Sequence, residues 1–469
     1  MDEVQQFFHF ALCQELQFAR TCCVQSHLPV PGGAVILSPD TKGQTGPDKA
    51  LRGGTNPISV KSVMQAAILI GGRGTRLGAA VSDTPKPLLE VAGRPFVEHL
   101  MLNLRRFGFT DFLLLAGYRA EVVRERYGPG APFPGELDAR VTVMVEPQPL
   151  GTAGALAFAA DQLQERFLLL NGDSIFDFNY LELCNCEHAQ EPADWLGRVA
   201  LLPVENATRY GFVELDGSVV SAFREKPRRP ESGLINSGVY WLRREVLDFI
   251  GPGPCSLEQD VFPQLAAARR LVGRSYEGFF IDIGIPGDLQ RARDTLARHL
   301  RRPAAFLDRD GTLNHDAGYT HRVQDFRWID GAKAAIRLLN DAGYLVFIVT
   351  NQAGIARGYY GPGEVETLHR WLRADLAADG AHVDDIRYCP HHPEGSVPAL
   401  AVRCGCRKPA TGMLDSLLAQ WQPDTARSAM FGDAEKDVEA GKAAGLAAYR
   451  VAPGELLETV RRHLAATRD

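Results

Sequence analysis

The sequence predicts an α/β protein built from two different domains that follow one another along the chain. Short apolar segments alternate with longer amphipathic segments from residue 65 to about residue 299, and a second alternation of the same kind begins at residue 303. Strand–helix alternation of this type predicts largely parallel sheets with helices on both faces. No internal repeat relates the two halves of the sequence, so we expect two distinct folds.

In chain order, the apolar strands and amphipathic helices can be assigned from their periodicity. The first domain is predicted to contain strands at 66–70, 112–117 and 167–173 and a helix at 96–108. The second is predicted to contain strands at 304–307, 345–351 and 428–432 and a helix at 334–343. We therefore place the domains at residues 64–300 and 303–469.

Residues 1–63 differ from the rest of the chain. Apolar residues recur at helical spacing between Val4 and Leu16, which predicts a short amphipathic helix. The stretch that follows is rich in Gly, Pro, Ser and Thr, a composition typical of loop or disorder. We expect a disordered or atypical tail without a catalytic role, either a partner-binding segment or sequence upstream of a start at Met64.

Composition and charge limit the class of protein. The 469 residues are 45% hydrophobic and 23% charged with a net charge of -6, which argues against a protein that coats nucleic acid or an anionic membrane. No apolar run reaches the ~18–20 residues of a membrane helix, and the start MDEVQQFF does not resemble a signal peptide. We expect a cytoplasmic enzyme with small-molecule substrates, no nucleic-acid or membrane partner, and an oligomeric state left open, a homo-oligomer included.

Two aspartates follow the first strand of the second domain, in Asp308-Arg-Asp310-Gly-Thr. A carboxylate can attack phosphorus and form an aspartyl-phosphate, and a second carboxylate can protonate the leaving oxygen and later deprotonate water. Because two carboxylates repel a phosphate, Mg²⁺ and cationic or hydroxyl donors are needed as well. The chain supplies candidates in order: Thr350 at a strand end, Lys408, and Asp433 with Asp437 after another strand.

These segments resemble the haloacid dehalogenase-like phosphatases over residues 303 to about 465. Within that superfamily, FLDRDGTLN, TNQAGIARG, CPHHPEG…CGCRKP and the GD box are similar to the heptose-bisphosphate phosphatases, with the histidinol-phosphate phosphatases as close relatives. The resemblance implies a Rossmannoid fold, Asp308 as nucleophile and Asp310 as general acid and base. It implies Mg²⁺ held by Asp308, the Asp310 carbonyl and Asp433, and a phosphoryl group held by Thr350 and Lys408. We assign the distal part of the substrate to Asn351, Arg357 and Arg407.

The stretch CPHHPEGSVPALAVRCGCRKP concentrates three of the nine cysteines of the chain. Cys389-x-His391 and Cys404-x-Cys406, with twelve residues between the pairs, offer four ligands for a tetrahedral Zn²⁺. A catalytic zinc would need an open position, and a disulfide is disfavoured in the cytoplasm. We therefore predict a structural zinc loop, with His392 as the alternative to His391, that fixes the segment carrying Arg407 and Lys408.

The first domain carries a glycine-rich segment, GGRGTRL at 71–77, followed by Pro85-Lys86-Pro87. Glycines allow backbone N–H groups to approach phosphates closely. Arg76 and Lys86 add positive charge at the same place. The order of the glycines matches neither the dinucleotide-binding nor the P-loop pattern, so the site is predicted to bind phosphates in another way.

GGxGTRL together with PKP resembles the sugar-phosphate nucleotidyltransferases, over residues 65 to about 295, which implies a Rossmann-like mixed sheet. EPQPLGTAGAL is similar to the loop that grips the base in that family. The resemblance implies Arg76 and Lys86 in catalysis and Asp173 and Asp282 as Mg²⁺ ligands. The implied nucleotide-binding residues are Gly71, Gly72, Gly74, Thr75, Glu146, Gly151 and Thr152. The implied sugar-phosphate-binding residues are Glu225, Lys226 and Asn236.

A phosphatase and a sugar-1-phosphate nucleotidyltransferase on one chain suggest consecutive steps. We expect removal of the 7-phosphate from D-glycero-D-manno-heptose 1,7-bisphosphate, then nucleotidyl transfer to heptose 1-phosphate, with Mg²⁺ at both sites. PLGTAGAL resembles guanylyltransferases, and Glu146 could accept both donors on the pairing edge of guanine, which favours GTP. The alternative is a mannose- or glucose-1-phosphate transferase fused to a histidinol-phosphate-type or other small-molecule phosphatase. An enzyme of nucleic-acid end repair would need a P-loop kinase motif and a basic face, and the sequence shows neither. A non-catalytic scaffold would not need two sets of catalytic carboxylates.

Overall fold

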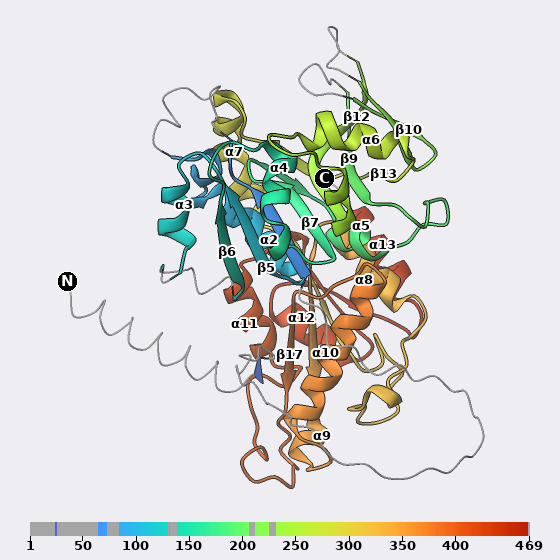
Figure 1. The fold of residues 1–469 in the computed structure, drawn as a ribbon. Helices are drawn as coiled ribbons and strands as arrows, with labels where there is room; N and C mark the ends of the chain where they lie inside the picture. Colours follow the sequence, from blue (N-terminus) through green and yellow to red (C-terminus); the bar gives the residue numbers. More distant parts are fainter. Residues whose placement is uncertain are drawn as a thin grey trace, which may run out of the picture.

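The computed structural model describes residues 24–25, 64–72, 84–129, 131, 138–205, 212–224 and 231–467. Two α/β units appear in Figure 1, one built on a nine-stranded sheet and the other on a six-stranded sheet. The helix predicted between Val4 and Leu16 lies outside the described residues.

The first unit is built on a mixed sheet with the strand order β10-β11-β13-β9-β12-β7-β2-β5-β6. Strands β6, β5, β2 and β7 are parallel neighbours, and β12 joins them antiparallel to both β7 and β9. The mixed sheet expected from the family resemblance is confirmed. The strands are β2 Met64–Leu69, β5 Phe109–Ala116, β6 Arg140–Val145, β7 Arg166–Asn171, β9 Gly197–Val204, β10 Phe212–Asp216, β11 Val219–Arg224, β12 Gly233–Arg243 and β13 Leu271–Ser275.

Helices cover both faces of this sheet, which explains why its central strands are mostly apolar. Leu100 of α2 and Leu289 of α7 belong to the core on one face, and Leu156 of α4 and Leu265 of α6 to the core on the other. The helices are α2 Phe96–Arg106, α3 Ala120–Tyr127, α4 Gly151–Phe158, α5 Tyr180–Asn185, α6 Phe262–Ala267 and α7 Pro286–Leu300. Shorter elements are η2 Lys86–Leu88, β3 Glu90–Val91, β4 Arg94–Pro95, η4 Ala160–Gln162, β8 Ser174–Asp177, η5 Arg244–Phe249, η6 Leu257–Val261 and β14 Phe279–Asp282.

The second unit contains a six-stranded sheet with the order β1-β17-β16-β15-β18-β19. All strands after β1 are parallel, and β1 (Val24–Gln25) pairs antiparallel with β17 at the sheet edge. The other strands are β15 Ala304–Leu307, β16 Leu345–Asn351, β17 Asp385–Cys389, β18 Ala429–Gly432 and β19 Ala447–Arg450. The helices are η7 Val323–Asp325, α8 Ala332–Asp341, α9 Ala353–Ala356, α10 Pro362–Ala378, α11 Gly412–Trp421, η8 Thr425–Arg427, α12 Glu435–Ala443 and α13 Leu456–Ala466.

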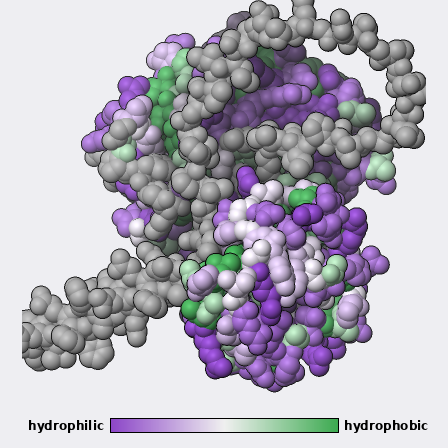
Figure 2. All heavy atoms as spheres, turned by 90° about the horizontal axis from the view of Figure 1, so that it is seen from below, coloured by the Kyte–Doolittle hydropathy of each residue, from purple (hydrophilic) through white to green (hydrophobic). Residues whose placement is uncertain are grey.

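The strands and helices that periodicity predicts for residues 64–300 and 303–469 are present in the structure. Apolar side chains of α8, α10 and α13 form the core on one face of the second sheet, and those of α11 and α12 on the other. The face of the molecule in Figure 2 is mainly hydrophilic, with hydrophobic residues scattered over it. No helix among the described residues is both long and apolar enough to cross a membrane.

The two units meet through a buried polar network around the short connection between α7 and β15. Arg302, in that connection, forms an ion pair with Asp177 at the end of β8, with 2.6 Å between Nη2 and Oδ2 and both side chains 7% exposed. Asp177 also contacts His299, and Asn103 of α2 donates to Asp177 and accepts from Arg302. Because burying unpaired charge is costly, this connection is held to the first unit at a defined place.

A second buried ion pair crosses the interface directly. Arg106, the last residue of α2, lies 2.7 Å (Nε to Oδ1) from Asp384, whose side chain has no exposed surface. Asp384 also accepts from the backbone N–H of Val346 at 2.7 Å, and Arg106 donates to the carbonyl of Tyr344. The ring of Phe107 packs on that of His382 with centroids 4.5 Å apart. Helix α2 is therefore attached to the residues directly before β16 and β17, Tyr344 and Asp384.

The buried pair gives a stability prediction. Arg106→Ala should lower the free energy of unfolding by about 3–5 kcal/mol, because it leaves the Asp384 carboxylate buried without its cation. Chemical denaturation of the full chain measures this change. The control is Arg105→Ala on the same helix, whose partner Asp138 is 76% exposed; it should cost less than about 1 kcal/mol. Equal losses in the two variants would contradict the prediction.

Candidate active sites

Polar side chains from three parallel strands meet at one edge of the second sheet. Asp308 follows β15, and its N–H donates to the carbonyl of Phe431 in β18 at 2.9 Å. Thr350 lies near the end of β16, and Asp433 follows β18. Carboxyl ends of neighbouring parallel strands share one edge, and ligand sites of open α/β sheets form there. The structure therefore brings these sequence-predicted residues together.

Lys408 lies at the centre of this site with no exposed side-chain surface. Its Nζ lies 2.7 Å from Asp308 Oδ1 and 2.7 Å from Asp437 Oδ1. It also donates to the carbonyl of Val349 at 2.7 Å. Asp308, Asp433 and Asp437 each offer a carboxylate oxygen within 4.8 Å of the others, an arrangement that could hold a metal ion. Hard oxygen ligands of this kind fit Mg²⁺.

The electrostatics of the site leave it short of positive charge. Burial raises the pKa of Asp308, Lys408 opposes this effect and Asp437 adds to it, and together they bring the pKa to about 6. Burial alone would lower the pKa of Lys408, but Asp308 and Asp437 reverse the effect and raise it. Burial and Asp437 also raise the pKa of Asp433. One ammonium thus faces three carboxylates, and a divalent cation would restore the balance.

Two glycines allow the carboxylates to approach the backbone. Gly311 has φ +88°, and a Cβ there would lie 2.4 Å from Asp433 Oδ2. A Cβ on Gly432 would lie 2.4 Å from the Cβ of Asp437. The glycine of the DxDGT motif, Gly311, is therefore needed for two reasons, a backbone conformation with positive φ and space for the Asp433 carboxylate.

Asp310 lies in a hydrogen-bond network of its own. The buried guanidinium of Arg309 donates to both carboxylate oxygens, with Nη2 2.9 Å from each. Asn314 donates to Oδ1 at 3.0 Å and Gln352 donates to Oδ2 at 2.9 Å. Gln352 also donates to Thr350 Oγ1 at 2.9 Å, so one amide fixes both the acid–base candidate and the phosphate-binding candidate.

Sequence reasoning did not assign roles to Arg309 and Gln352. Arg309 is the variable position of the DxDGT motif, and Gln352 follows the strand end that carries Thr350. Gln352 itself accepts from the hydroxyl of Tyr360 at 2.8 Å. The position of the Gln352 amide next to a strand end was the one signal in the sequence for its role. That signal was not sufficient, because its partners Asp310 and Tyr360 come from other segments of the chain.

Asn351, Arg357 and Arg407 lie around the same edge, but each is engaged by protein groups. Asn351 exchanges two hydrogen bonds with the backbone of Lys408, both 3.1 Å long, and so holds its main chain. Arg407 donates to the carbonyl of His391 at 3.3 Å. Arg357 lies 3.7 Å from Glu394 and 3.5 Å from the ring of His392. Their assignment to the substrate stays a prediction.

The Cys/His stretch forms a compact cluster directly before Lys408. The Sγ atoms of Cys389, Cys404 and Cys406 lie 3.3–3.5 Å apart, and His391 Nδ1 lies 3.4 Å from Cys406 Sγ. Tetrahedral thiolate ligands at ~2.3 Å from a metal would be separated by about 3.8 Å. The four atoms thus fit a closed tetrahedral metal site. His392 instead contacts Arg357 and the Glu394 N–H.

The protonation state of the Cys and His side chains in this cluster depends on whether a metal ion is bound. The neighbouring Cys406 thiol and burial raise the pKa of Cys389, and burial lowers the pKa of His391, which keeps the imidazole neutral. Neutral imidazole and thiolates are the ligand forms that metals bind. A metal ion would reverse the effect on the thiols, since it stabilises the thiolate.

In the first unit, the candidate metal ligands meet across two sheets. Asp173 follows β7, and Asp282 ends β14. Lys86 Nζ lies 2.8 Å from Asp173 Oδ2. Burial and the nearby Asp173 raise the pKa of Asp282, whose carboxylate accepts from the Gly284 N–H at 2.6 Å. Two carboxylates with one lysine are a donor set suited to Mg²⁺ and a phosphate.

The glycine-rich segment is described only in part. Gly71 and Gly72 directly follow β2 and Ile70, whereas Gly74, Thr75, Arg76, Glu225 and Lys226 lie outside the described residues. The Glu146 carboxylate closes against the described glycines, because a Cβ on Gly117 would lie 2.1 Å from its Oε1 and one on Gly71 3.0 Å. Burial raises the pKa of Glu146, which accepts from the Leu150 N–H at 3.1 Å.

The remaining candidates of the first unit are linked to one another through Glu258. Thr152 Oγ1 donates to Glu258 at 3.0 Å and accepts from the Leu257 N–H. Asn236 donates to the Tyr240 hydroxyl at 2.7 Å, and that hydroxyl donates to Glu258. Gly151 adopts φ +76° and contacts the carbonyl of Cys255, where a Cβ would approach to 2.5 Å. These side chains reinforce the local structure, and their contact with substrate stays a prediction.

The two sites define an enzyme with two kinds of phosphorus chemistry, one domain for nucleotidyl transfer and one for phosphate-ester hydrolysis. Residues 65–299 match the family model for nucleotidyl transferases, and residues 405–468 match a HAD-hydrolase-like model. The chain belongs to the nucleotidyl transferase family through its first domain and to the HAD-like phosphatases through its second.

The second domain is similar to curated proteins named as heptose-1,7-bisphosphate 7-phosphatases. The chain is 51% identical over 150 residues to a D-glycero-beta-D-manno-heptose-1,7-bisphosphate 7-phosphatase from Rhodopseudomonas palustris, covering 32% of this chain and 83% of the relative. The corresponding Escherichia coli K12 protein is 46% identical over 144 residues, covering 31% and 75%. The solved structure of HddC from Yersinia pseudotuberculosis complexed with GMP-PN is 28% identical, covers 50% of this chain and 99% of its own, and has a TM-score of 0.43.

The two reasons for glycine at position 311 can be separated experimentally. Gly311→Ala should reduce phosphate release and Mg²⁺ affinity strongly, because its methyl group would displace the Asp433 carboxylate. Gly318→Ala is the matched control, since Gly318 has φ +80° in the same loop but open space around its Cβ position. It should cost only about 1–2 kcal/mol of backbone strain and leave hydrolysis nearly unchanged. Similar losses of phosphatase activity in the two variants would show that strain alone is responsible.

Proposed function

We propose that this chain removes the 7-phosphate of D-glycero-D-manno-heptose 1,7-bisphosphate and then attaches a nucleotide to the resulting heptose 1-phosphate. The observation that carries the proposal is the buried Asp308–Lys408–Asp437 cluster, in a domain whose relatives act on heptose bisphosphate, on one chain with a nucleotidyl transferase. Dephosphorylation leaves a sugar 1-phosphate, which is the acceptor that such a transferase requires. We assign hydrolysis to residues 303–469 and transfer to residues 64–300.

In the hydrolytic reaction, Asp308 would attack the phosphorus of the 7-phosphate. The bond from phosphorus to the sugar oxygen breaks, Asp310 supplies the proton to that oxygen, and an aspartyl-phosphate remains. Asp310 then takes a proton from water, which attacks the phosphorus and frees Asp308 and phosphate. Lys408 and Thr350 hold the phosphoryl oxygens. Mg²⁺ held by Asp308, the Asp310 carbonyl and Asp433 would neutralise the charge that develops on the phosphoryl group.

In the transfer reaction, an oxygen of the sugar 1-phosphate would attack the α-phosphorus of the nucleoside triphosphate, and pyrophosphate leaves. This chemistry needs positioning and charge neutralisation, not a covalent intermediate. Arg76 and Lys86 would bind the phosphates, Lys226 with Glu225 the incoming sugar phosphate, and Asn236 the sugar hydroxyls. Asp173 and Asp282 would hold Mg²⁺, which supplies charge neutralisation at the α-phosphate.

We propose GTP as the nucleotide. The Glu146 carboxylate lies against Gly71 and Gly117 with one oxygen held by the Leu150 N–H, beside the predicted base-gripping loop. Guanine presents two neighbouring donors on its pairing edge, which a carboxylate can accept. The product would then be GDP-heptose, a precursor of surface polysaccharide.

We propose that the Cys389–His391–Cys404–Cys406 cluster holds a structural Zn²⁺. All four positions are filled by protein ligands, so no open coordination site remains for chemistry. The zinc would fix the loop that ends on Arg407 and Lys408. Free thiols and a nucleoside triphosphate substrate suit a cytoplasmic location.

Two single substitutions should separate the activities. Asp308→Asn keeps the shape of the side chain but removes the nucleophile, so phosphate release from heptose 1,7-bisphosphate should fall by roughly 10⁴-fold or more. Asp173→Asn should abolish only nucleotidyl transfer. Phosphate and pyrophosphate release, measured with GTP and Mg²⁺, distinguish the two losses.

Supplied heptose 1-phosphate provides the control for these variants. The Asp308→Asn protein should convert it to GDP-heptose at the normal rate, and the Asp173→Asn protein should stop at heptose 1-phosphate. If the intact enzyme hydrolyses heptose 1,7-bisphosphate no faster than histidinol phosphate or unrelated esters, the substrate assignment is wrong. A preference for UTP or dTTP over GTP would overturn the choice of nucleotide.

Removing one ligand tests the zinc proposal. Cys404→Ser should lower the zinc content below one per chain and lower the melting temperature of the second domain, because structural zinc contributes folding free energy. Phosphatase activity should fall while nucleotidyl transfer is retained. Cys186→Ser, a change at another half-buried cysteine, should keep the zinc. Full phosphatase activity in a protein shown to be zinc-free would remove the role of the metal in fixing Lys408.

A further inference from the structure

Within the described part of the chain, the contacts given above between the two domains lie at one end of the phosphatase sheet. They involve Arg302 before β15, Tyr344 directly before β16 and Asp384 directly before β17. These are the amino ends of three parallel strands. The candidate catalytic residues lie at the carboxyl ends of the same sheet, so the sheet separates the interface from the phosphatase site.

The length of the strands sets the distance. Strand β16 runs over seven residues from Leu345, beside the interface, to Asn351, which spans about 20 Å at a rise of roughly 3.3 Å from one residue to the next. Helix α9 follows β16 and lies at the end of the molecule far from the first unit in Figure 1, whereas α8 lies beside that unit. The phosphatase site therefore opens away from the transferase.

The transferase domain is oriented in the same way relative to the interface. Arg106 and Phe107 come just before β5 and contact the phosphatase. Gly71 and Asp173 follow the carboxyl ends of β2 and β7, which run parallel to β5. Along the chain, β8 leads from Asp173 to Asp177 at the interface, over four residues or about 13 Å. The two sites are thus separated by on the order of 35 Å of folded protein.

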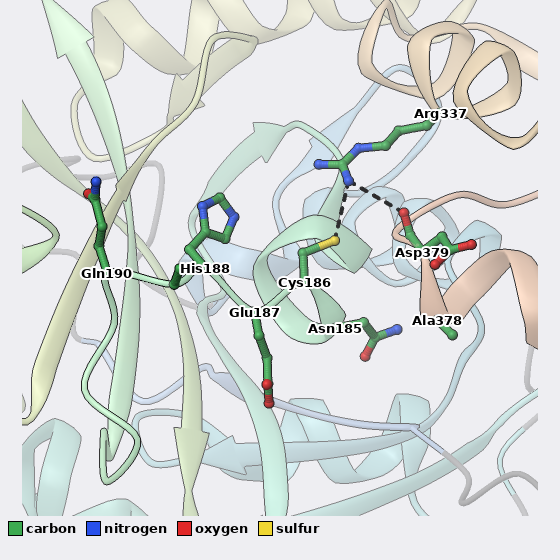
Figure 3. Close-up of a pocket in the computed structure, with 9 residues that line it drawn as sticks. Asn185, Cys186, Glu187, His188, Gln190, Arg337, Ala378 and Asp379 are labelled. Carbon is green, nitrogen blue, oxygen red and sulfur yellow. Dashed lines mark hydrogen bonds between the residues drawn. The ribbon is translucent and has the colours of Figure 1, made fainter. Parts of the chain in front are cut away.

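Two cavities at the domain boundary are lined by residues that belong to neither candidate site. One of about 680 Å³ is lined by Asn185, Cys186, His188, Arg337, Asp379 and four neighbouring residues, which Figure 3 shows in close-up. A second of about 590 Å³ lies against it, with His188 and Gln190 in both linings. Within the described part of the chain, neither lining contains a candidate catalytic or substrate-binding residue of either domain.

We infer that the two active sites open in opposite directions, so the dephosphorylated sugar 1-phosphate leaves the protein and reaches the transferase through bulk solvent. The inference rests on the proposed function for the order of the two steps. The fusion then fixes the ratio of the two activities but provides no direct transfer of the intermediate from one active site to the other. Any other enzyme that consumes this sugar 1-phosphate would compete for it on equal terms.

Mixing two full-length variants tests the inference. Asp308→Asn provides only the transferase and Asp173→Asn only the phosphatase. At equal concentrations of each active site, the mixture should make nucleotide sugar from the bisphosphate with the same lag and the same steady rate as the intact enzyme. A several-fold shorter lag in the intact enzyme would mean direct transfer and would overturn the inference.

Isotope dilution gives an independent measurement on the intact enzyme. With labelled bisphosphate and a tenfold excess of unlabelled sugar 1-phosphate over that formed, label in the nucleotide sugar should fall about elevenfold, as free mixing requires. Label retained well above that level would show that intermediate passes between sites, whether within one chain or between chains of an oligomer.

The orientation of the sites can be measured without any substrate. Mn²⁺ added to the full chain should occupy both carboxylate clusters, and pulsed dipolar spectroscopy should give a separation on the order of 35 Å. A separation below about 20 Å would overturn the inference through its geometry. Failure of the proposed function would look different, because the intact enzyme would then release no phosphate from the bisphosphate while the Mn²⁺ separation stayed large.

Discussion

The phosphatase half of the molecule depends on keeping one ammonium group charged in the interior. The side chain of Lys408 has no exposed surface, and its charge is tolerated only because Asp308 and Asp437 lie 2.7 Å away. Asp308 lies directly after strand β15 and Asp437 lies in helix α12, so both elements must be in place around Lys408. Asn351 holds the main chain of Lys408 through two hydrogen bonds, and the Cys/His cluster lies directly before that segment.

The opposite end of the same sheet carries a second set of buried charges with a different purpose. Asp384 is neutralised by Arg106, and Arg302 by Asp177; Arg106 and Asp177 both belong to the other domain. The candidate catalytic residues thus lie at the carboxyl ends of the parallel strands, and the contacts with the other domain lie at their amino ends. Separating the partners of these ion pairs would leave buried charges unpaired, so the two domains tolerate little movement relative to each other. The ion pairs therefore also fix the direction in which each site opens.

Much of this arrangement could be predicted from the sequence, because the signals were local. Asp308 follows a short apolar run, and its position at a strand end follows from that run alone. Cys389, His391, Cys404 and Cys406 are paired by spacing, and the structure brings their ligand atoms together. The spacing of such a motif predicts the site because residues close together in the chain supply most of its ligand atoms.

What the sequence did not predict arises from contacts between distant segments. Nothing near Arg106 distinguishes it from Arg105, yet one is buried against Asp384, 278 positions later, and the other pairs on the surface. In the sequence nothing distinguishes Gln352 from other amides, whereas in the fold its side chain donates to both Asp310 and Thr350. Such side chains satisfy buried polar groups whose partners are set by tertiary packing. The direction of each active site belongs to the same class, since it depends on which strand ends the two domains bury against each other.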